Sequence, residues 1–324
     1  MGKRLLITGG AGFIGSHVSE YFLERGWSLD IIDDLSTGKR HQVPSAARFH
    51  QMDVSSPDAA RVIRDGGFDV IVHLAAQMDV RKSVADPLRD AGINILGTVN
   101  MLEAVRHGRA RGTRFVFSST GGVLYGDFVT PPNRETFAKD PESPYAISKL
   151  SAEYYLAYYS RVHGLDTVAL RYGNVYGPRQ DPHGEAGVVA IFCGRILEGR
   201  PLTVYGKGTQ TRDYVHVADV AAATFLAATS RLPAPGRLDE RGFNIGTGVG
   251  TSVNSLAKTL LDVSGSGVAV EYGPARAGEQ EHSFLDVSKA ATVLGWRAET
   301  GLEAGLRQSY RWFEAQHHSQ VVRT

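Results

Sequence analysis

The chain has 324 residues, a formal net charge of +1 and a single cysteine, and this composition excludes several classes of protein. Its length predicts roughly two domains at about 150 residues each. One cysteine, Cys193, rules out an intramolecular disulfide, so we expect a reducing, cytoplasmic setting. The 35 basic and 34 acidic residues give no electrostatic surface for nucleic acid, and no apolar run approaches the roughly 20 residues that span a membrane.

Short apolar runs alternate with longer amphipathic stretches along the first half of the chain. This pattern is typical of βαβ units around a parallel sheet. The predicted strands are residues 4–7, 28–32, 48–50, 70–74, 114–117 and 167–170. Residues 14–24 are expected to form a helix that ends before Gly26. The sequence therefore predicts an α/β fold with a doubly wound, parallel Rossmann sheet.

The second half of the chain is less regular. Beyond about residue 175 only residues 243–245 are predicted to add a strand to the sheet. We expect a Rossmann domain over residues 1–175 and a smaller α/β substrate lobe over residues 176–324. Residues 212–247 are expected to pack back onto the first domain. The polar tail from His317 to Thr324 is expected to fray.

Residues 8–15, TGGAGFIG, join the first predicted strand to the first predicted helix. Glycines there would let the backbone approach a pyrophosphate, which the N–H groups of the helix N-terminus would bind. Asp33 ends the second strand about 20 residues beyond Gly12, where a carboxylate accepts hydrogen bonds from the adenosine ribose. Its charge would repel a 2′-phosphate, which favours NAD over NADP. Asp53, after the third strand, is a candidate adenine contact or a loop cap.

A tyrosine and a lysine stand four residues apart near a predicted helix start. Ser143 is placed as the cap and Pro144 in the first turn, so Tyr145 and Lys149 share one helix face. A tyrosine titrating near 10 needs its pKa lowered by about 3 units, or roughly 4 kcal/mol, to act as a base at neutral pH. A neighbouring ammonium and a positive nicotinamide ring would supply this, which predicts a catalytic pair.

Further segments follow in order along the whole chain: residues 73–76 (HLAA), Asn94, residues 118–120 (SST), 170–174 (LRYGN), 212–217 (RDYVHV) and 276–279 (RAGE). With the glycine loop and the Tyr145–Lys149 pair, they resemble the extended short-chain dehydrogenase/reductases. Within these, the chain resembles the NAD-dependent nucleotide-sugar epimerases. The resemblance implies 4-epimerisation of a UDP-hexose, UDP-glucose or UDP-galactose, through a transient 4-keto intermediate and with tightly bound NAD.

The resemblance also implies roles for individual residues. The catalytic residues would be Tyr145, Lys149 and Thr120, whose hydroxyl would bridge Tyr145 to the sugar 4-hydroxyl. The implied NAD-binding residues are Gly9, Gly12, Phe13, Ile14, Gly15, Asp33, Asp53, Val54, Leu74, Ala75, Ala76, Asn94, Ser118, Tyr145, Lys149 and Tyr172. The implied UDP-sugar residues are Thr120, Tyr145, Asn174, Val189, Thr203, Tyr205, Arg212, Arg276, Glu279 and Ser283. Among them, Asn174, Arg212 and Arg276 would contact the diphosphate, and Glu279 the uridine ribose.

Related reactions are separated by the residues after Thr120. Similar 4,6-dehydratases carry Asp-Glu there, whereas this chain has Gly121 and Gly122, which cannot transfer a proton. UDP-glucuronate decarboxylases, which carry an acid near that place, are disfavoured in the same way. UDP-glucuronate 4-epimerase stays open, because its carboxylate pocket is not readable from the sequence. A non-catalytic NAD-sensing protein is disfavoured because both Tyr145 and Lys149 are present.

Three further expectations concern substrate width, assembly and metals. Ser283 is small where epimerases with a narrow sugar pocket carry tyrosine, which predicts use of UDP-GlcNAc and UDP-GalNAc, unless other residues narrow the pocket. The resemblance implies a homodimer that forms through residues 87–106 and a face of the helix after Tyr145, with intramolecular packing as the alternative. That face carries Tyr154, Tyr155, Tyr158 and Tyr159. The histidines show no metal-binding spacing, so no metal is expected, and Cys193 is expected in the core.

Overall fold

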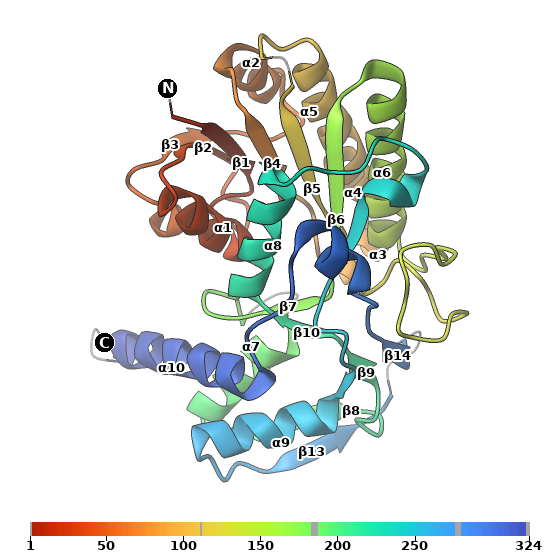
Figure 1. Cartoon of the computed structure of the whole chain (residues 1–324). Coiled ribbons are helices and arrows are strands. Elements are labelled where there is room, and N and C mark those ends of the chain that lie inside the picture. Colours follow the sequence, from red (N-terminus) through yellow and green to blue (C-terminus); the bar gives the residue numbers. More distant parts are fainter. Residues whose placement is uncertain (1, 111, 183–186, 276–279, 322–324) are drawn as a thin grey trace.

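The computed structural model describes residues 2–110, 112–182, 187–275 and 280–321 (Figure 1). A seven-stranded sheet with only parallel pairs has the order β11-β6-β5-β4-β1-β2-β3. Its strands are β1 (Arg4–Thr8), β2 (Ser28–Asp33), β3 (Arg48–Gln51), β4 (Val70–His73), β5 (Arg114–Thr120), β6 (Asp166–Tyr172) and β11 (Gly242–Ile245). The predicted doubly wound parallel sheet is thereby confirmed.

All seven strands predicted for this sheet are present, but β5 and β6 are longer than predicted. Residues 118–120 continue β5 and pair with residues 170–172 of β6. The polar residues of β5 gave no apolar pattern, so only the pairing reveals the extension. Because β1 pairs with both β2 and β4, the strand order reverses direction beside β1. In open α/β sheets, ligands bind at the carboxyl ends of strands near such a point.

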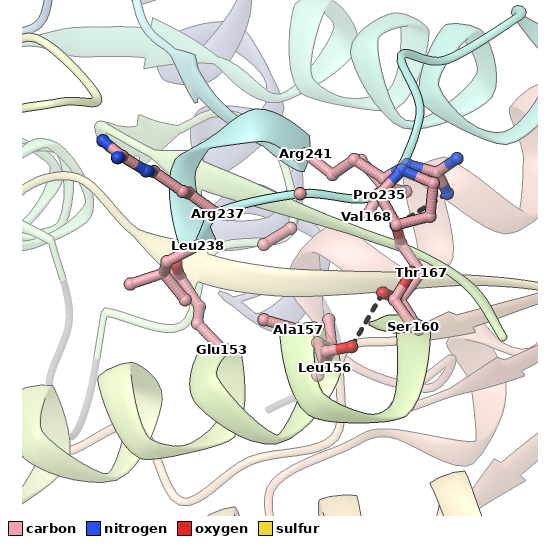
Figure 2. A pocket seen from close by; sticks show the side chains of 12 residues that line it. Glu153, Leu156, Ala157, Ser160, Thr167, Val168, Pro235, Arg237, Leu238 and Arg241 are labelled. Atoms are coloured by element: carbon pink, nitrogen blue, oxygen red, sulfur yellow. Dashed lines mark hydrogen bonds between the residues drawn. The ribbon is translucent and has the colours of Figure 1, made fainter. Parts of the chain in front are cut away.

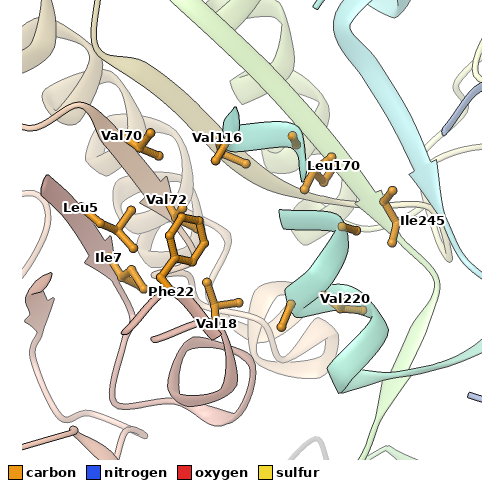
Figure 3. Packing of buried hydrophobic residues seen from close by; sticks show 14 of the residues in the cluster. Leu5, Ile7, Val18, Phe22, Val70, Val72, Val116, Leu170, Val220 and Ile245 are labelled. Carbon is orange, nitrogen blue, oxygen red and sulfur yellow. The ribbon is translucent and has the colours of Figure 1, made fainter. Parts of the chain in front are cut away.

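Helices cover both faces of the sheet, and each face has its own core. Successive residues of a strand point to opposite faces. Leu5 and Ile7 of β1 therefore pack with α1 (Phe13–Leu23) and α8 (Val217–Thr229) (Figure 3). Leu6, between them, belongs to the core on the other face. That core includes residues of α2 (Pro57–Gly66), α5 (Gly97–Arg106) and α6 (Pro144–His163).

A run of helical elements precedes α5, interrupted at Asp86. It consists of α3 (Val80–Ala85), α4 (Pro87–Ala91) and η2, a π-helical turn over Gly92–Leu96. The predicted first helix begins one residue early, at Phe13. Ser143 caps α6 as predicted, because its hydroxyl accepts a hydrogen bond from the N–H of Ala146 at 3.3 Å.

The second half of the chain contains more strands than the sequence predicted. Pairs form between β7 (Asn174–Tyr176) and β10 (Tyr214–His216), and between β8 (Leu202–Tyr205) and β13 (Val270–Gly273). A third small sheet joins β9 (Thr211–Arg212), β12 (Thr251–Ser252) and β14 (His282–Ser283). Strands of two to four residues are too short to show an alternating pattern, and their partners lie far away in the sequence.

A third core lies among α7 (Val188–Leu197), α9 (Val253–Ser264) and α10 (Leu302–Val321), which stand together in the lower part of Figure 1. The expectation that the chain frays from His317 is wrong, because α10 continues to Val321. Short turns occur at η1 (Arg40–Gln42), η3 (Leu238–Arg241) and η4 (Ala290–Leu294). No helix in the described part of the chain is both long and apolar enough to span a membrane.

The two halves of the sequence are interleaved in space. Val220 and Ala221 of α8 and Phe243 of β11 pack in the core that β1 and α1 build. Residues 212–247 thus contribute directly to the sheet and one of its layers. The domain boundary at residue 175 stays a prediction.

Candidate active site

The carboxyl ends of the parallel strands carry most of the candidate residues. The glycine loop follows β1, Asp33 ends β2, and residues 74–76 follow β4. Thr120 ends β5, and Asn174 comes two residues after β6. Because parallel strands end at the same edge of a sheet, residues far apart in sequence are brought to one side of the molecule.

Two glycines of the first loop occupy positions that no side chain fits. A Cβ at Gly15 would lie 2.1 Å from the carbonyl oxygen of Gly9, and Gly9 itself has φ +73°. A Cβ at Gly9 would lie 2.7 Å from the nitrogen of Ala75. Gly12 precedes α1, and no side chain caps this helix terminus. Phe13 begins the helix, so the N–H groups of its first turn remain as donors for an anion.

Asp33 is buried at the end of β2 beside this loop. Its carboxylate accepts hydrogen bonds from the N–H of Ala11 at 2.9 Å and of Leu35 at 2.8 Å. Burial raises the pKa of Asp33, and these two hydrogen bonds oppose the shift. Asp53 is exposed, and its carboxylate accepts from the N–H and hydroxyl of Ser55, both at 2.7 Å. Asp53 therefore caps its own loop, which leaves its predicted adenine contact as a prediction.

A chain of hydrogen bonds fixes the ends of β1 and β4. The N–H of Ala75 donates to the Thr8 hydroxyl at 3.2 Å, and the Thr8 oxygen lies 2.7 Å from His73 Nδ1. Nε2 of His73 lies 3.0 Å from the Thr98 hydroxyl, which donates to the Asn94 carbonyl at 2.7 Å. Thr98 must therefore accept from Nε2–H, and Thr8 donates to Nδ1. Burial lowers the pKa of His73 to about 3, which keeps it neutral.

The side chain of Asn94 holds the loop after β4. Its amide donates to the Gln77 carbonyl at 2.8 Å, and its oxygen accepts from the Gln77 N–H at 3.0 Å. Leu74, Ala75 and Ala76 precede Gln77 and are half-buried. Asn94 thus positions the predicted NAD-binding segment, and both its amide nitrogen and its amide oxygen are used in these hydrogen bonds.

Tyr145 and Lys149 lie on α6 against the end of β5. Lys149 is buried, and its ammonium donates to the Ser118 carbonyl at 2.9 Å. The same nitrogen lies 5.9 Å from the centre of the Tyr145 ring. Burial lowers the pKa of Lys149 to about 8, while the carboxylates of Asp90 and Glu153 oppose the shift. The predicted pair is therefore adjacent in space, with a lysine that is a cation at neutral pH.

A second cluster surrounds Gly121 and Gly122. A Cβ at Gly122 would lie 3.3 Å from Asn174 Oδ1 and 3.9 Å from Thr120 Oγ1. The Ser283 hydroxyl donates to the Gly122 carbonyl at 3.1 Å, and Ser283 is buried. A Cβ at Gly121 would lie 2.7 Å from the Leu285 side chain. The structure thus brings Thr120, Asn174 and Ser283 to one corner that has almost no room for a larger residue.

Asp213 joins three segments of this side of the site. Its buried carboxylate accepts from the N–H and hydroxyl of Thr247 at 2.6 and 2.7 Å. It also accepts from the N–H groups of Gly248 at 3.1 Å and Leu285 at 3.2 Å. Its own carbonyl accepts from the N–H of Asn174 at 2.7 Å. Asp213 therefore connects these segments by hydrogen bonds and fixes the positions of its neighbour Arg212 and of the segment carrying Ser283.

The sequence family that matches residues 5–246 is described as the NAD dependent epimerase/dehydratase family. The chain belongs to this family. A UDP-glucose 4-epimerase of Mycolicibacterium smegmatis is 40% identical over 96% of this chain and 98% of its own length. The structure resembles UDP-glucose 4-epimerase of Thermotoga maritima, solved with UDP-glucose, with a TM-score of 0.90, 42% identity and coverage of 97% and 99%. It also resembles the Thermus thermophilus enzyme in complex with NAD, with a TM-score of 0.87, 42% identity and coverage of 96% and 99%.

Four other residues predicted from the resemblance to this epimerase/dehydratase family lie in the third core, on β8 or on β6. Val189 is buried in the third core, and Thr203 accepts a hydrogen bond from Arg195 at 2.6 Å. Tyr205 ends β8 and is half-buried. Tyr172 is buried with its hydroxyl 2.9 Å from that of Thr224, on α8.

Three predicted residues remain to be located. Val54 is buried in the core with α2 and α5, directly after Asp53. Arg276 and Glu279 lie outside the described residues. Their predicted contacts with the diphosphate and the uridine ribose therefore stay predictions.

Two buried carboxylates, Glu153 and Asp90, lie near the predicted catalytic residues of this epimerase/dehydratase family member and could not be recognised from the sequence alone. Glu153 forms an ion pair with Arg171 at 2.6 Å, and it accepts from the Ser119 hydroxyl at 2.5 Å. Asp90 is fully buried on α4. Both stand on helices, where an isolated acidic residue usually indicates a solvent-facing position. The partners of Glu153, Arg171 and Ser119, lie in segments that the sequence singled out, residues 170–174 and 118–120.

A cleft between α6, β6 and residues 235–241 is separate from these clusters (Figure 2). Its lining includes Glu153, Ala157 and Ser160 from α6, together with Leu238 and Arg241. None of the twelve residues that line it is a predicted NAD or substrate residue. The predicted NAD and substrate residues therefore do not line this cleft.

Proposed function

We propose that the protein catalyses NAD-dependent 4-epimerisation of a UDP-hexose, interconverting UDP-glucose and UDP-galactose. The observation that carries the proposal is the end of β5. There, Lys149 donates to Ser118, and Thr120 is followed by Gly121 and Gly122, which are packed against other segments. Membership of the NAD dependent epimerase/dehydratase family and the likeness to UDP-glucose 4-epimerases support the same reaction.

The chain's own residues fit NAD. Gly9 and Gly15 leave a loop surface without side chains beside an uncapped helix N-terminus, which suits a pyrophosphate. The Asp33 carboxylate lies at the end of the neighbouring strand, with lone pairs left for ribose hydroxyls. When bound, NAD would supply reversible oxidation of the sugar at C4. Lys149 and the loop at residues 74–76 would border its nicotinamide half.

Proton transfer would be carried by Tyr145, with Thr120 as the bridging hydroxyl. Lys149 would stabilise the phenolate of Tyr145 by its charge, because its ammonium lies in a buried environment where Coulombic interactions are strong. The 4-ketose formed in the first half of the reaction would turn within the site. Reduction from the opposite face would then invert C4.

The packing of Gly121 argues against a dehydratase. That reaction needs acid and base groups after Thr120, but a Cβ at Gly121 would lie 2.7 Å from Leu285 and 3.0 Å from the Arg171 carbonyl. A side chain able to transfer a proton would therefore require displacement of both neighbours. The lack of space at Gly121 therefore favours epimerisation, which needs only Thr120, Tyr145 and Lys149.

Ser283 favours a second group of substrates, the N-acetylated UDP-hexosamines. Its small side chain contacts Gly122, next to Thr120, so a bulky residue at position 283 would extend toward the place proposed for the sugar. Replacing Ser283 with Tyr is expected to suppress turnover of UDP-GlcNAc more than that of UDP-glucose. Equal loss of both activities would show that other residues set the pocket width.

The proposed reaction is tested by incubating the purified protein separately with UDP-glucose, UDP-GlcNAc and UDP-glucuronate, and following the products by NMR. We expect UDP-galactose from UDP-glucose without added NAD, because the cofactor stays bound. Tyr145→Phe should lower kcat by about 10²–10⁴-fold. Tyr154→Phe, at an exposed tyrosine of the same helix, is the matched control. Turnover of UDP-glucuronate alone would reassign the substrate, and full activity of Tyr145→Phe would refute the mechanism.

We also propose a homodimer that acts in the cytoplasm. Large apolar side chains are exposed on the neighbouring elements α4, η2 and α6: Leu88, Leu96, Ile147, Tyr154, Tyr155, Tyr158 and Val162. Tyr159, in contrast, is buried and donates to Glu103 of α5 at 2.5 Å. The sequence has a single cysteine, the buried Cys193, so the chain forms no internal disulfide, as is usual for proteins of a reducing compartment.

A further inference from the structure

Asp90 is a fully buried carboxylate whose hydrogen-bond donors are neutral. Its Oδ1 accepts from the side-chain amides of Gln77 at 3.0 Å and Asn94 at 2.9 Å. Its Oδ2 accepts from the Ser148 hydroxyl at 2.6 Å. None of the ion pairs formed within the described ranges includes Asp90. Hydrogen bonds satisfy the oxygens of a buried carboxylate, but its charge still needs a nearby cation.

Lys149 is the cation nearest in sequence to these partners, because it directly follows Ser148. Its ammonium is buried and donates to the Ser118 carbonyl, which carries no formal charge. The charge of Asp90 favours the protonated form of Lys149. Asp90 and Lys149 are therefore two buried charges of opposite sign, connected through neighbouring residues of α6.

The other ionisable groups around Lys149 do not replace Asp90. Glu153, one turn along α6, is already paired with Arg171, whose nitrogens lie 2.6–3.2 Å from its carboxylate oxygens. His73 of β4 is neutral by its hydrogen-bonding pattern. Tyr145 shares the helix and is the group on which Lys149 would act. Of the facing carboxylates, Asp90 is the one whose charge no arginine or lysine neutralises by contact in the described structure.

We propose that Asp90 is a positioning residue that keeps Lys149 protonated and ties α4, the loop after β4 and the start of α6 together. This inference rests on the proposed function, because it assigns Asp90 to the same reaction. Burial, opposed by the charges of Asp90 and Glu153, leaves the pKa of Lys149 at about 8, close to neutral pH. Loss of the Asp90 charge would lower this pKa further, so the ammonium would be lost at a lower pH. Activity that needs the ammonium would then decline nearer neutrality.

The test compares Asp90→Asn with Ser148→Ala. The first keeps the shape and an amide oxygen for Gln77 and Asn94 but removes the charge. The second removes a hydrogen bond to Asp90 but keeps the charge. We measure kcat for UDP-glucose across alkaline pH. Asp90→Asn should move the alkaline midpoint down by about one pH unit, and Ser148→Ala should leave that midpoint in place.

A second measurement does not depend on turnover. NMR of the folded protein labelled with ¹³C at lysine Cε, with the Lys149 signal identified by its loss in Lys149→Arg, reports the pKa of this amine in each variant. The same downward shift is expected for Asp90→Asn and, if that variant does not fold, for Asp90→Ser. Equal Lys149 midpoints in the wild type and the neutral variants would overturn the role of Asp90. A lower Lys149 midpoint in the variants than in the wild type, together with a wild type that does not epimerise UDP-glucose, would instead refute the proposed function.

Discussion

At the scale of single residues, backbone space and hydrogen-bond direction define the candidate site. Gly15 is required because the loop closes on itself, and Gly9 because its backbone has a positive φ and passes against Ala75. His73 has a defined neutral form because both of its nitrogens face threonine hydroxyls. Asp33 and Asp213 are buried carboxylates that backbone N–H groups satisfy.

Gly15→Ala tests whether the glycine loop at residues 8–15 binds the pyrophosphate of NAD. The added Cβ would lie 2.1 Å from the Gly9 carbonyl oxygen, so the loop must shift away from a pyrophosphate. We expect the purified variant to retain less than about a tenth of the wild-type NAD, which corresponds to at least 1.4 kcal/mol. Gly92→Ala is the control, since a Cβ there meets nothing within 4 Å. Equal NAD content in the two variants, measured after denaturation, would contradict the assignment.

His73 makes stability depend on acid pH. Its pKa is about 3 in the folded chain because of burial and, less, the Lys149 charge, against 6.5 as the ordinary value. As pH falls below 6.5 the unfolded chain takes up a proton and the folded chain does not, so the free energy of unfolding decreases. The slope contributed is about 1.4 kcal/mol per pH unit. Urea unfolding of His73→Gln between pH 6 and pH 4 should show a shallower decline, and parallel curves would exclude this origin.

At the scale of elements, α1 and α8 pack against each other and cover one face of the sheet. Phe22 of α1 lies 5.1 Å from Phe225 of α8 and 5.2 Å from Trp27, measured between ring centres. Both helices carry small or branched residues such as Val18 and Val220 toward β1 and β4 (Figure 3). The contact joins residues about 200 positions apart in the sequence, so α8 stabilises the glycine loop at the start of α1.

Phe22→Ala should therefore lower the free energy of unfolding by about 3–5 kcal/mol, because the ring is fully buried and its removal leaves a cavity. Phe128→Ala is the matched control: this ring is 87% exposed, and its removal should change the free energy by less than about 0.5 kcal/mol. Urea unfolding at neutral pH measures both. Similar losses in the two variants would mean that α1 is held by other contacts.

At the scale of the whole molecule, large apolar side chains are exposed on the contacting elements α4, η2 and α6. Leu88 is 86% exposed and Leu96 64% exposed, and Tyr154 on the neighbouring α6 is 56% exposed. Large apolar side chains gathered on one surface of a protein mark interaction sites. This surface adjoins α6, which carries Tyr145 and Lys149, so a partner seated there would also brace the candidate active site.

A double substitution, Leu96→Glu with Tyr154→Glu, should shift the protein from dimer to monomer in sedimentation equilibrium, because buried like charges oppose association. Tyr272→Glu introduces the same charge at a residue that is 61% exposed on β13, and should leave the dimer intact. A wild type that sediments as a monomer at micromolar concentration would contradict the proposed assembly.

Much of the nucleotide-binding half could be predicted from local patterns. Buried parallel strands are continuous apolar runs, and a glycine loop between a strand and a helix is recognisable without a partner. Tyr145 and Lys149 could be paired because a helix sets their spacing. The short strands β7 to β10 and the extension of α10 could not be predicted, because their stability comes from segments remote in sequence.

The sequence by itself determined the parallel sheet, the glycine loop with Asp33, and the Tyr145–Lys149 pair, since the patterns that identify their strands and helices are local. Only the tertiary structure decided what surrounds them. It packed Leu285 and Asn174 against Gly121 and Gly122, and it buried Asp90 near Lys149. These contacts join segments tens to more than a hundred residues apart, and their burial fixes the space and charge on which the proposed chemistry depends.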